Sequence, residues 1–213
     1  MNARIGGGAR LARRALLVAA AAAGFALSCA VGAANAAPPR LKAGVFDPPR
    51  PAPLVTLDGS DGRAFDLARY RGKVVLLSFG FSNCPAVCPT TLATLAQARS
   101  ELGPLAADVQ VVFVTVDPER DTVAQLKTYL AAFDAGFVGA TGRADALALL
   151  RAGFGATATK VPYAKAFGDK AYGFDHTSSV YLIDRQGRLM GMMPYDHPAK
   201  DYVHDLRLLL AAR

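Results

Sequence analysis

The pattern of hydrophobic and polar positions predicts buried strands alternating with amphipathic helices. Residues 74–79 and 109–116 are continuous apolar runs of strand length, as expected for strands that are covered on both faces of a sheet. Apolar residues at helical spacing predict four helices, over residues 89–102, 122–133, 143–154 and 199–211. The second of these helices begins with a capping box, in which Thr122 precedes Gln125 by three positions.

Two hairpins complete the expected elements. Residues 54–67 form one around a Gly/Asp turn, and residues 179–183 and 189–193 flank a turn at 184–187 in the other. Residues 155–173 show no clear period and are expected to be a loop. This order predicts a single α/β domain over residues 54–213, with a thioredoxin-like fold and a central mixed sheet flanked by helices.

The first 53 residues differ in composition from the rest of the chain. Residues 1–36 carry four arginines and no acidic residue, then an alanine-rich apolar run, and they end in a small-x-small pattern. They are interpreted as a signal peptide cleaved before Ala37, or as an N-terminal membrane anchor. Lipidation at Cys29 is a weaker alternative. Residues 37–53 are rich in proline and are interpreted as an extended linker.

Charge gives little indication of a polyanionic partner. The net charge of the whole chain is +7, and the four arginines of the leader supply more than half of it. The remaining +3 is ordinary for a domain of this size, so we expect no nucleic-acid binding.

Cys84 and Cys88 are the candidate chemistry of the chain. They follow the predicted strand at 74–79 and lie four positions apart, so in a helical turn they share a face. Thiols near a helix N-terminus have a lowered pKa, and thiolates bind Cu(I), zinc or iron–sulfur clusters. The pair therefore predicts either a soft-metal site or a redox pair, and a structural disulfide is the plainer alternative.

His176 is the candidate third ligand. It directly precedes the strand predicted at 179–183, which in a thioredoxin-like sheet runs antiparallel to 74–79. Its start then lies at the edge where the cysteines lie. The preceding Asp175 is a candidate for orienting the imidazole or for adding charge next to it. Asp117, at the end of the strand over 109–116, is a candidate for supporting the site, with a turn residue as the plainer reading. His197 and His204 are interpreted as surface residues.

These motifs resemble the Sco/SenC family of copper-binding proteins. The resemblance rests on Phe79-Gly-Phe-Ser-Asn-Cys84-Pro-Ala-Val-Cys88-Pro89, on Val116-Asp-Pro-Glu-Arg-Asp-Thr122, and on Asp175-His176-Thr177 before Val180-Tyr-Leu-Ile-Asp184. It covers residues 52–211. Ala86 departs from the family, many members of which carry an acidic or polar residue there.

The resemblance implies a periplasmic protein, in many members tethered to the inner membrane, that binds one copper ion, Cu(I) or Cu(II), through Cys84, Cys88 and His176. It implies a role in building the dinuclear copper centre of cytochrome c oxidase, with the copper-bearing subunit or another periplasmic copper carrier as partner. A metallochaperone is favoured over an enzyme. A periplasmic thiol–disulfide oxidoreductase that uses the two cysteines, and a copper or redox sensor, remain as alternatives.

Overall fold

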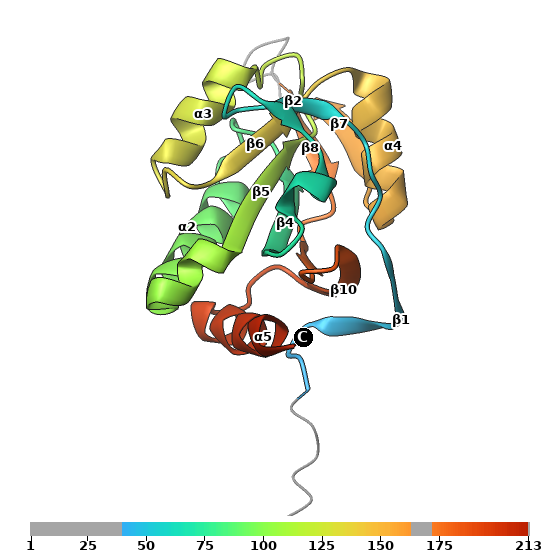
Figure 1. Cartoon of the computed structure of the whole chain (residues 1–213). Helices are drawn as coiled ribbons and strands as arrows, with labels where there is room; N and C mark the ends of the chain where they lie inside the picture. The colour runs from blue at the N-terminus through green and yellow to red at the C-terminus, as the bar shows by residue number, and fades with distance from the viewer. Residues whose placement is uncertain (1–39, 163–171, 213) are drawn as a thin grey trace, which may run out of the picture. The chain divides into compact units, whose positions relative to one another are not determined.

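The structure, a computed structural model, describes residues 40–162 and 172–212. Within them, eight strands form one mixed sheet in the order β1-β10-β9-β4-β5-β6-β2-β3 (Figure 1). Pairing is parallel for β4 with β5 and for β5 with β6, and antiparallel for the others. The strands are β1 Gly44–Pro51, β2 Leu57–Gly59, β3 Ala64–Phe65, β4 Val74–Gly80, β5 Val109–Thr115, β6 Val138–Thr141, β9 Val180–Ile183 and β10 Arg188–Met193.

Helices cover both faces of this sheet, as predicted. Helices α2 (Val87–Glu101), α3 (Val123–Ala131) and α5 (Ala199–Ala211) pack on one face, and α4 (Ala144–Phe154) packs on the other (Figure 1). A hydrophobic core lies on each face of the sheet, and β4 contributes to both because its side chains alternate between the faces. Val74 and Leu76 face the three helices, while Val75 and Leu77 face α4. This burial on two faces explains why β4 is a continuous apolar run. The mixed α/β, thioredoxin-like fold class is confirmed.

Local signals in the sequence set several boundaries. The hydroxyl of Thr122 accepts a hydrogen bond from the Gln125 amide and so caps α3, as the capping box predicts. Gly155 ends α4 in the left-handed conformation, with φ of 69°. Two short 3-10 helices, Leu67–Tyr70 and Gly103–Asp108, lead into β4 and β5.

The pairing of β9 with β4 places the candidate site. Val180, the first residue of β9, is opposite Ser78 near the end of β4. Because the strands are antiparallel, whatever precedes β9 lies at the same sheet edge as whatever follows β4. The sequence between β4 and α2 carries Cys84, and His176 lies just before β9. The topology therefore brings the cysteine loop and His176 to one edge.

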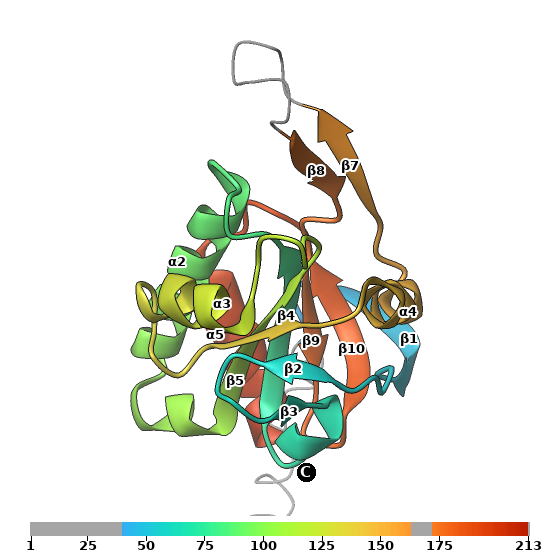
Figure 2. The same ribbon diagram turned by 90° about the horizontal axis from the view of Figure 1, so that it is seen from above.

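The structure differs from the prediction in four places. The stretch interpreted as a linker, 37–53, contains β1, an edge strand that pairs with β10 through its backbone. The stretch expected to be a loop, 155–173, contains β7 (Ala158–Pro162), which pairs with β8 (Tyr172–His176) in a separate two-stranded sheet that stands away from the main sheet (Figure 2). Strand β6 was not predicted. The first hairpin is shorter than expected and consists of β2 and β3.

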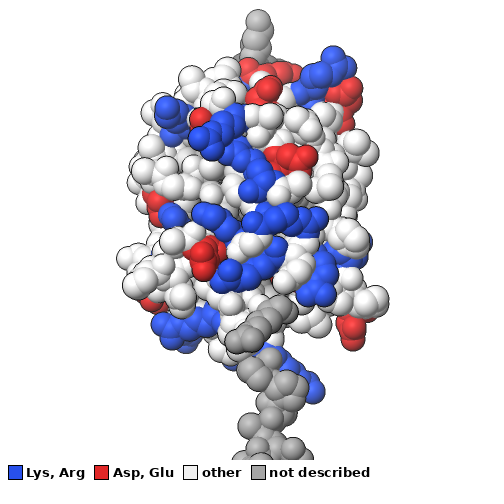
Figure 3. Space-filling view, viewed as in Figure 1, with Lys and Arg blue, Asp and Glu red and all other residues white. Residues whose placement is uncertain are grey.

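One face of the domain carries a band of basic side chains (Figure 3). Lys and Arg gather across the middle of the face shown in Figure 3, with few Asp and Glu among them. Several basic residues of the domain are paired with carboxylates, as in Arg69–Asp61, Arg185–Asp108 and Arg188–Asp184. Such partly exposed pairs stabilise a fold only weakly, by about 0–1 kcal/mol each.

The leader lies outside the described residues, so its prediction as a signal peptide or membrane anchor stays a prediction. Among the helices of residues 40–162 and 172–212, none is long and apolar enough to cross a membrane.

Candidate metal and thiol site

The two cysteines lie where β4 passes into α2. Cys84 is half-buried in the connecting loop, and Cys88 is buried in the first turn of α2; both are free thiols. Gly80, the last residue of β4, makes room for Cys88. A Cβ atom at Gly80 would lie 2.7 Å from the Cys88 Sγ and 2.6 Å from the Phe113 ring. Glycine at this position therefore lets the sulfur pack directly against the strand.

The N-terminus of α2 stabilises a thiolate at Cys84. Ala86, the N-cap residue, has no side chain that could accept from the free amides of the first turn. Interactions with the Cys88 thiol, the His176 ring and the amides of Cys88 and Ala86 favour the charged form of Cys84. Together they outweigh burial and lower the pKa of Cys84 to about 3. The same contact with Cys84, together with burial, raises the pKa of Cys88. The pair therefore consists of one thiolate and one thiol that donates to it.

His176 completes the cluster from across the sheet edge. Its Nε2 lies 3.8 Å from the Cys88 Sγ, and its Nδ1 lies 3.0 Å from the Thr177 carbonyl oxygen. A carbonyl only accepts, so Nδ1 carries the proton and donates it. In the neutral ring, Nε2 then has a lone pair directed at the thiols, which is the usual arrangement of a metal-binding histidine. Burial lowers the pKa of His176, but hydrogen bonds to Cys84 and Thr177 outweigh it, and the net shift is upward.

Packing holds the imidazole in place. Its ring meets Phe81 edge to face, with centroids 5.9 Å apart and an angle of 82°. Phe81 is buried and also meets Phe174 of β8 edge to face. The cysteine loop and the His176 strand are thus joined by an aromatic contact as well as by the polar cluster.

A small cavity adjoins these side chains. Ser78, Cys88, His176 and Ser178 are among the residues that line it, and its volume of about 10 Å³ is close to that of one water-sized atom. The buried Ser78 hydroxyl has no hydrogen-bond partner within the described residues. A soft donor set with an unsatisfied polar atom beside a single-atom space fits a bound metal ion and one further oxygen ligand.

The donors are close to one another without enclosing an ion. Across residues 40–162 and 172–212, no three Cys, His, Asp or Glu side chains are arranged closely enough to hold a metal. The Cys88 Sγ to His176 Nε2 separation of 3.8 Å is suited to a hydrogen-bonded pair. Binding of a metal by all three donors therefore requires their side chains to move closer together.

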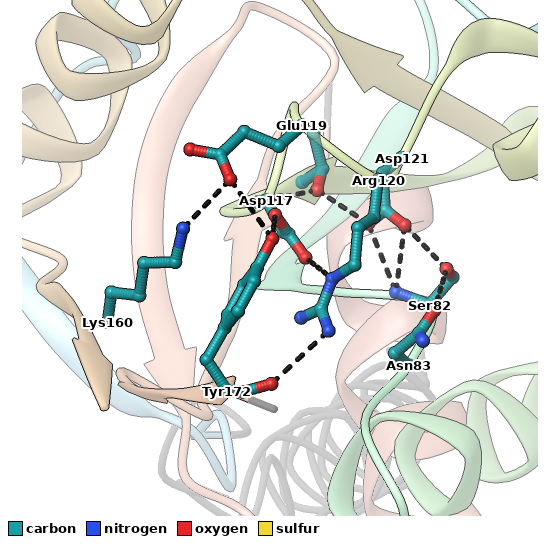
Figure 4. A network of polar contacts seen from close by, with 9 residues as sticks. Ser82, Asn83, Asp117, Glu119, Arg120, Asp121, Lys160 and Tyr172 are labelled. Atoms are coloured by element: carbon teal, nitrogen blue, oxygen red, sulfur yellow. Dashed lines mark hydrogen bonds and ion pairs between the residues drawn. The ribbon is translucent and has the colours of Figure 1, made fainter. Parts of the chain in front are cut away.

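Asp121 fixes the cysteine loop. Its fully buried carboxylate accepts hydrogen bonds from the Ser82 amide, at 3.0 Å, and from the Ser82 hydroxyl (Figure 4). The Thr115 hydroxyl donates to the same carboxylate at 2.6 Å. Ser82 lies two residues before Cys84. The end of β5 therefore holds the loop that presents the first thiol.

A second polar cluster fixes the hairpin that carries His176. The ring of Tyr172 lies between two cations, with Arg120 Cζ 3.8 Å and Lys160 Nζ 3.7 Å from its centroid (Figure 4). Its hydroxyl donates to Asp117, at 3.1 Å, and Arg120 pairs with the same carboxylate. Glu119 pairs with Lys160 at 2.8 Å. The segment after β5 thus holds the β7–β8 hairpin, and we name these five residues the hairpin clamp.

The two candidate supporting aspartates have different positions. Asp117 is buried and belongs to the hairpin clamp, so it contacts the hairpin rather than the donors themselves. Asp175 is exposed, and the Thr177 carbonyl, instead of the Asp175 carboxylate, accepts from His176 Nδ1. Asp175 acts on the imidazole only through its charge, as a minor cause of the raised pKa of His176.

Sequence reasoning missed the contribution of Phe81, Arg120, Asp121 and Tyr172. Arg120 and Asp121 carried a signal, because they follow a buried strand at the edge where the cysteine loop lies. Tyr172 carried none, since Asp117 and Arg120 are more than 50 positions away and its segment has no clear period. The structure does bring together Cys84, Cys88 and His176.

Comparison with known proteins identifies relatives of this chain. The SCO1/SenC family model matches residues 54–211. A SCO2-like protein of Rickettsia conorii is 35% identical over 150 residues, which cover 69% of this chain and 71% of the relative. A putative copper-binding protein of Stutzerimonas stutzeri is 36% identical over 146 residues, 67% of this chain and 68% of the relative.

Solved structures extend the similarity to the fold. The structure of Bradyrhizobium japonicum ScoI with copper bound superposes with a TM-score of 0.68 and 33% identity, covering 75% of this chain and 99% of that one. The family match over most of the chain and the identity of these relatives lead to one conclusion. The chain belongs to the SCO1/SenC family.

Proposed function

We propose that this protein binds one copper ion through Cys84, Cys88 and His176, and that it serves the maturation of the dinuclear copper centre of cytochrome c oxidase. The observation that carries the proposal is the pairing of two adjacent thiols with an imidazole whose Nε2 faces Cys88 and whose Nδ1 donates to Thr177. Two sulfurs and one nitrogen form a soft donor set that suits trigonal Cu(I).

The electrostatics of the pair support loading at neutral pH. Metals bind the thiolate form of cysteine. Because the pKa of Cys84 is lowered, this residue is already a thiolate at pH 7 and need not lose a proton when the metal binds. The proton on Cys88 leaves when the metal binds, because a coordinated thiol is deprotonated. The raised pKa of His176 means that Nε2 gives up its proton when the metal binds, as the Cys88 thiol does. Cu(II) additionally takes an oxygen ligand, for which the cavity beside Ser78 has room for one water-sized atom.

Relatives support the choice of copper over zinc. The Bradyrhizobium japonicum ScoI structure contains copper, and so does a yeast Sco1 structure that is 28% identical and superposes with a TM-score of 0.69. The proposed setting is the periplasm, reached through the leader at 1–36 and with a tether to the inner membrane if that leader is retained. The proposed partner is the copper-bearing oxidase subunit or another periplasmic copper carrier.

Copper transfer to the apo form of the copper-bearing domain tests this function. The full-length protein loaded with Cu(I) is mixed anaerobically with the reduced apo-domain, and filling of the dinuclear centre is followed by the copper content of the re-isolated domain. We expect the centre to form with the wild-type protein and to fail with the Cys84→Ser/Cys88→Ser variant under the same copper supply. Equal formation with both proteins would contradict delivery by this site.

A second function, thiol–disulfide exchange, is favoured by one observation. A thiolate at Cys84 beside the protonated Cys88 is the arrangement of a dithiol that attacks a disulfide and then resolves the mixed disulfide. The Cys84 sulfur would bond to one sulfur of the partner disulfide and release the other as a thiol. Cys88 would then displace the partner, leaving a Cys84–Cys88 disulfide and a reduced partner.

The two functions differ in their need for His176. A redox pair retains its two cysteines in His176→Ala, whereas the proposed copper site loses a ligand. We therefore expect His176→Ala to reduce an oxidised apo-domain at a rate close to wild type while it fails to deliver copper. Delivery that survives in this variant would favour the redox function alone.

A further inference from the structure

A pocket lies beside the candidate site, between α2 and the loop that joins β10 to α5. Its volume is about 170 Å³, room for the end of a long side chain. One wall carries Thr90, Thr91 and Thr94 of α2, and the other carries Asp196, His197 and Tyr202. We call it the threonine pocket.

The topology places this pocket at the same sheet edge as the thiols. Met193, the last residue of β10, pairs with Val180, which in turn pairs with Ser78 near the end of β4. The loop after β10 therefore emerges where the cysteine loop begins. Thr91 lines both the threonine pocket and the small cavity next to Cys88 and His176. A molecule that covers the thiols thus reaches the threonine pocket within one turn of α2.

The threonines present hydrogen-bond acceptors to the pocket. Each hydroxyl donates its only proton to the backbone carbonyl four residues earlier. The oxygen–oxygen distance is 2.9 Å for Thr90 and 3.0 Å for Thr91 and Thr94. Lone pairs alone remain for a ligand. A row of three such hydroxyls on one helix face makes that wall an acceptor surface.

The opposite wall also carries the hydroxyls of Tyr195 and Tyr202, and it adds negative charge. Asp196 contributes a carboxylate, and it is held in a left-handed conformation with φ of 77°, which non-glycine residues rarely adopt. His197 donates from Nδ1 to Asp201 at 3.1 Å, so in the neutral ring its Nε2 is a further acceptor. Asp201 also lies in the first turn of α5 and offsets the positive end of that helix.

We propose that the threonine pocket receives an arginine side chain of the protein that exchanges copper with this site. A guanidinium offers five N–H donors in a fixed plane and no acceptor, which matches a pocket of dispersed acceptors and one carboxylate. A lysine offers three donors from a single point and matches fewer of them. This inference rests on the proposed copper function for the identity of the partner, but the pocket itself does not depend on the cysteines.

Titration with small probes tests the pocket directly. Amide resonances of the reduced full-length protein are followed by NMR while N-acetyl-arginine amide is added, with N-acetyl-citrulline amide as the neutral probe of the same shape. We expect saturable shifts at Thr90, Thr94, Asp196 and His197 with the arginine probe, and at least fivefold weaker binding of the citrulline probe.

Two variants locate the effect. Asp196→Asn removes the charge, and asparagine tolerates the left-handed conformation; Thr94→Val removes one acceptor without a change of shape. We expect each to weaken binding of the arginine probe at least threefold. Asp145→Asn is the control, because Asp145 is exposed on α4 at the other face of the sheet. Unchanged binding in both pocket variants overturns the proposal, as does stronger binding of N-acetyl-glutamate amide, which would mark an anion site.

The Cys84→Ser/Cys88→Ser variant separates this inference from the copper function. We expect it to bind the arginine probe as the wild type does, since neither sulfur lines the threonine pocket. Arginine binding that vanishes with the cysteines would overturn the pocket as an independent docking point. A failure of copper transfer with intact arginine binding would instead contradict the copper proposal alone.

Discussion

The Nε2 atom of His176 lies 3.8 Å from the Sγ atom of Cys88, although 88 positions separate the two residues in the chain. The contact follows from the antiparallel pairing of β4 with β9, which places the end of one strand beside the start of the other. It joins a short-range feature, two cysteines at a helix N-terminus, to a side chain from the β7–β8 hairpin. The candidate site therefore depends on how firmly the cysteine loop and that hairpin are held.

Removal of the charge at Asp121 should loosen the cysteine loop. Asp121→Asn keeps the shape but replaces a buried acceptor of three hydrogen bonds by an amide, which leaves at least one donor without a good partner. We expect a loss of about 2–3 kcal/mol in the free energy of unfolding, measured by urea denaturation of the metal-free protein. The exposed Asp175→Asn is the control and should change stability by less than about 0.5 kcal/mol. Equal stability of the two variants would contradict the role of Asp121.

A methyl group at Gly80 should displace the Cys88 sulfur. Gly80→Ala puts a Cβ atom 2.7 Å from that sulfur and 2.6 Å from Phe113, both buried, so one of them must move. We expect a loss of stability of about 1–3 kcal/mol, typical of overpacking, and weaker Cu(I) binding. Gly62→Ala is a useful comparison, because no atom lies within 4 Å of its added Cβ, although its positive φ of 79° adds backbone strain. Gly62→Ala should lower stability and leave copper affinity unchanged, whereas a drop in copper affinity in both would point to general destabilisation.

The hairpin clamp should matter more for copper affinity than for stability. Tyr172→Ala removes two cation–π contacts and the hydrogen bond to Asp117 from a partly exposed position. We expect a cost of about 1–2 kcal/mol in unfolding and a clear decrease in Cu(I) affinity, because His176 lies on the same strand. Tyr172→Phe keeps the ring between the cations and should fall between wild type and Tyr172→Ala in a chelator competition. Wild-type affinity in Tyr172→Ala would show that the clamp does not position His176.

The lowered pKa of Cys84 gives a pH-dependent prediction. A folded pKa of about 3 means that Cys84 is already a thiolate well below neutral pH, while Cys88, with a raised pKa, keeps its proton. Since the thiolate is the reactive form, the rate of alkylation by iodoacetamide should be nearly constant between about pH 5 and about pH 7, and confined to Cys84. An ordinary thiol with a pKa near 8.5 would react about tenfold faster per pH unit over this range. Such a steep rise, or equal labelling of both cysteines, would contradict the thiolate at Cys84.

Strong local patterns predicted most of the fold. The apolar runs of β4 and β5 and the periodic helices were visible because each is buried through its own side chains. Strand β6 was missed because it has four residues, including Gly139 and no alternation of polar and apolar positions. Strand β1 was missed because its side chains are mostly exposed and its prolines favour a linker, while its pairing with β10 is made by backbone atoms.

The residues of the candidate site also fall into those that the sequence predicted and those that it did not. Cys84, Cys88 and His176 were predictable because their residue types are rare in the chain and chemically distinctive. Asp121 and Tyr172 were not, because their contribution consists of contacts with Ser82 and Asp117, which only the folded chain brings near. The hydrogen bond that orients His176 comes from the Thr177 carbonyl, a backbone group that no sequence pattern reveals, while Asp175 adds only its charge.

The most direct test of the copper site is the stoichiometry and affinity of Cu(I) binding, measured anaerobically by chelator competition for the reduced wild type, His176→Ala and His204→Ala. His204 contacts Asp205 on α5 and serves as the matched control. We expect one tightly bound copper per chain in the wild type and in His204→Ala, and an affinity at least about 10–100-fold lower in His176→Ala. Negligible binding by the wild type, or equal affinity in His176→Ala, would contradict the three-ligand site.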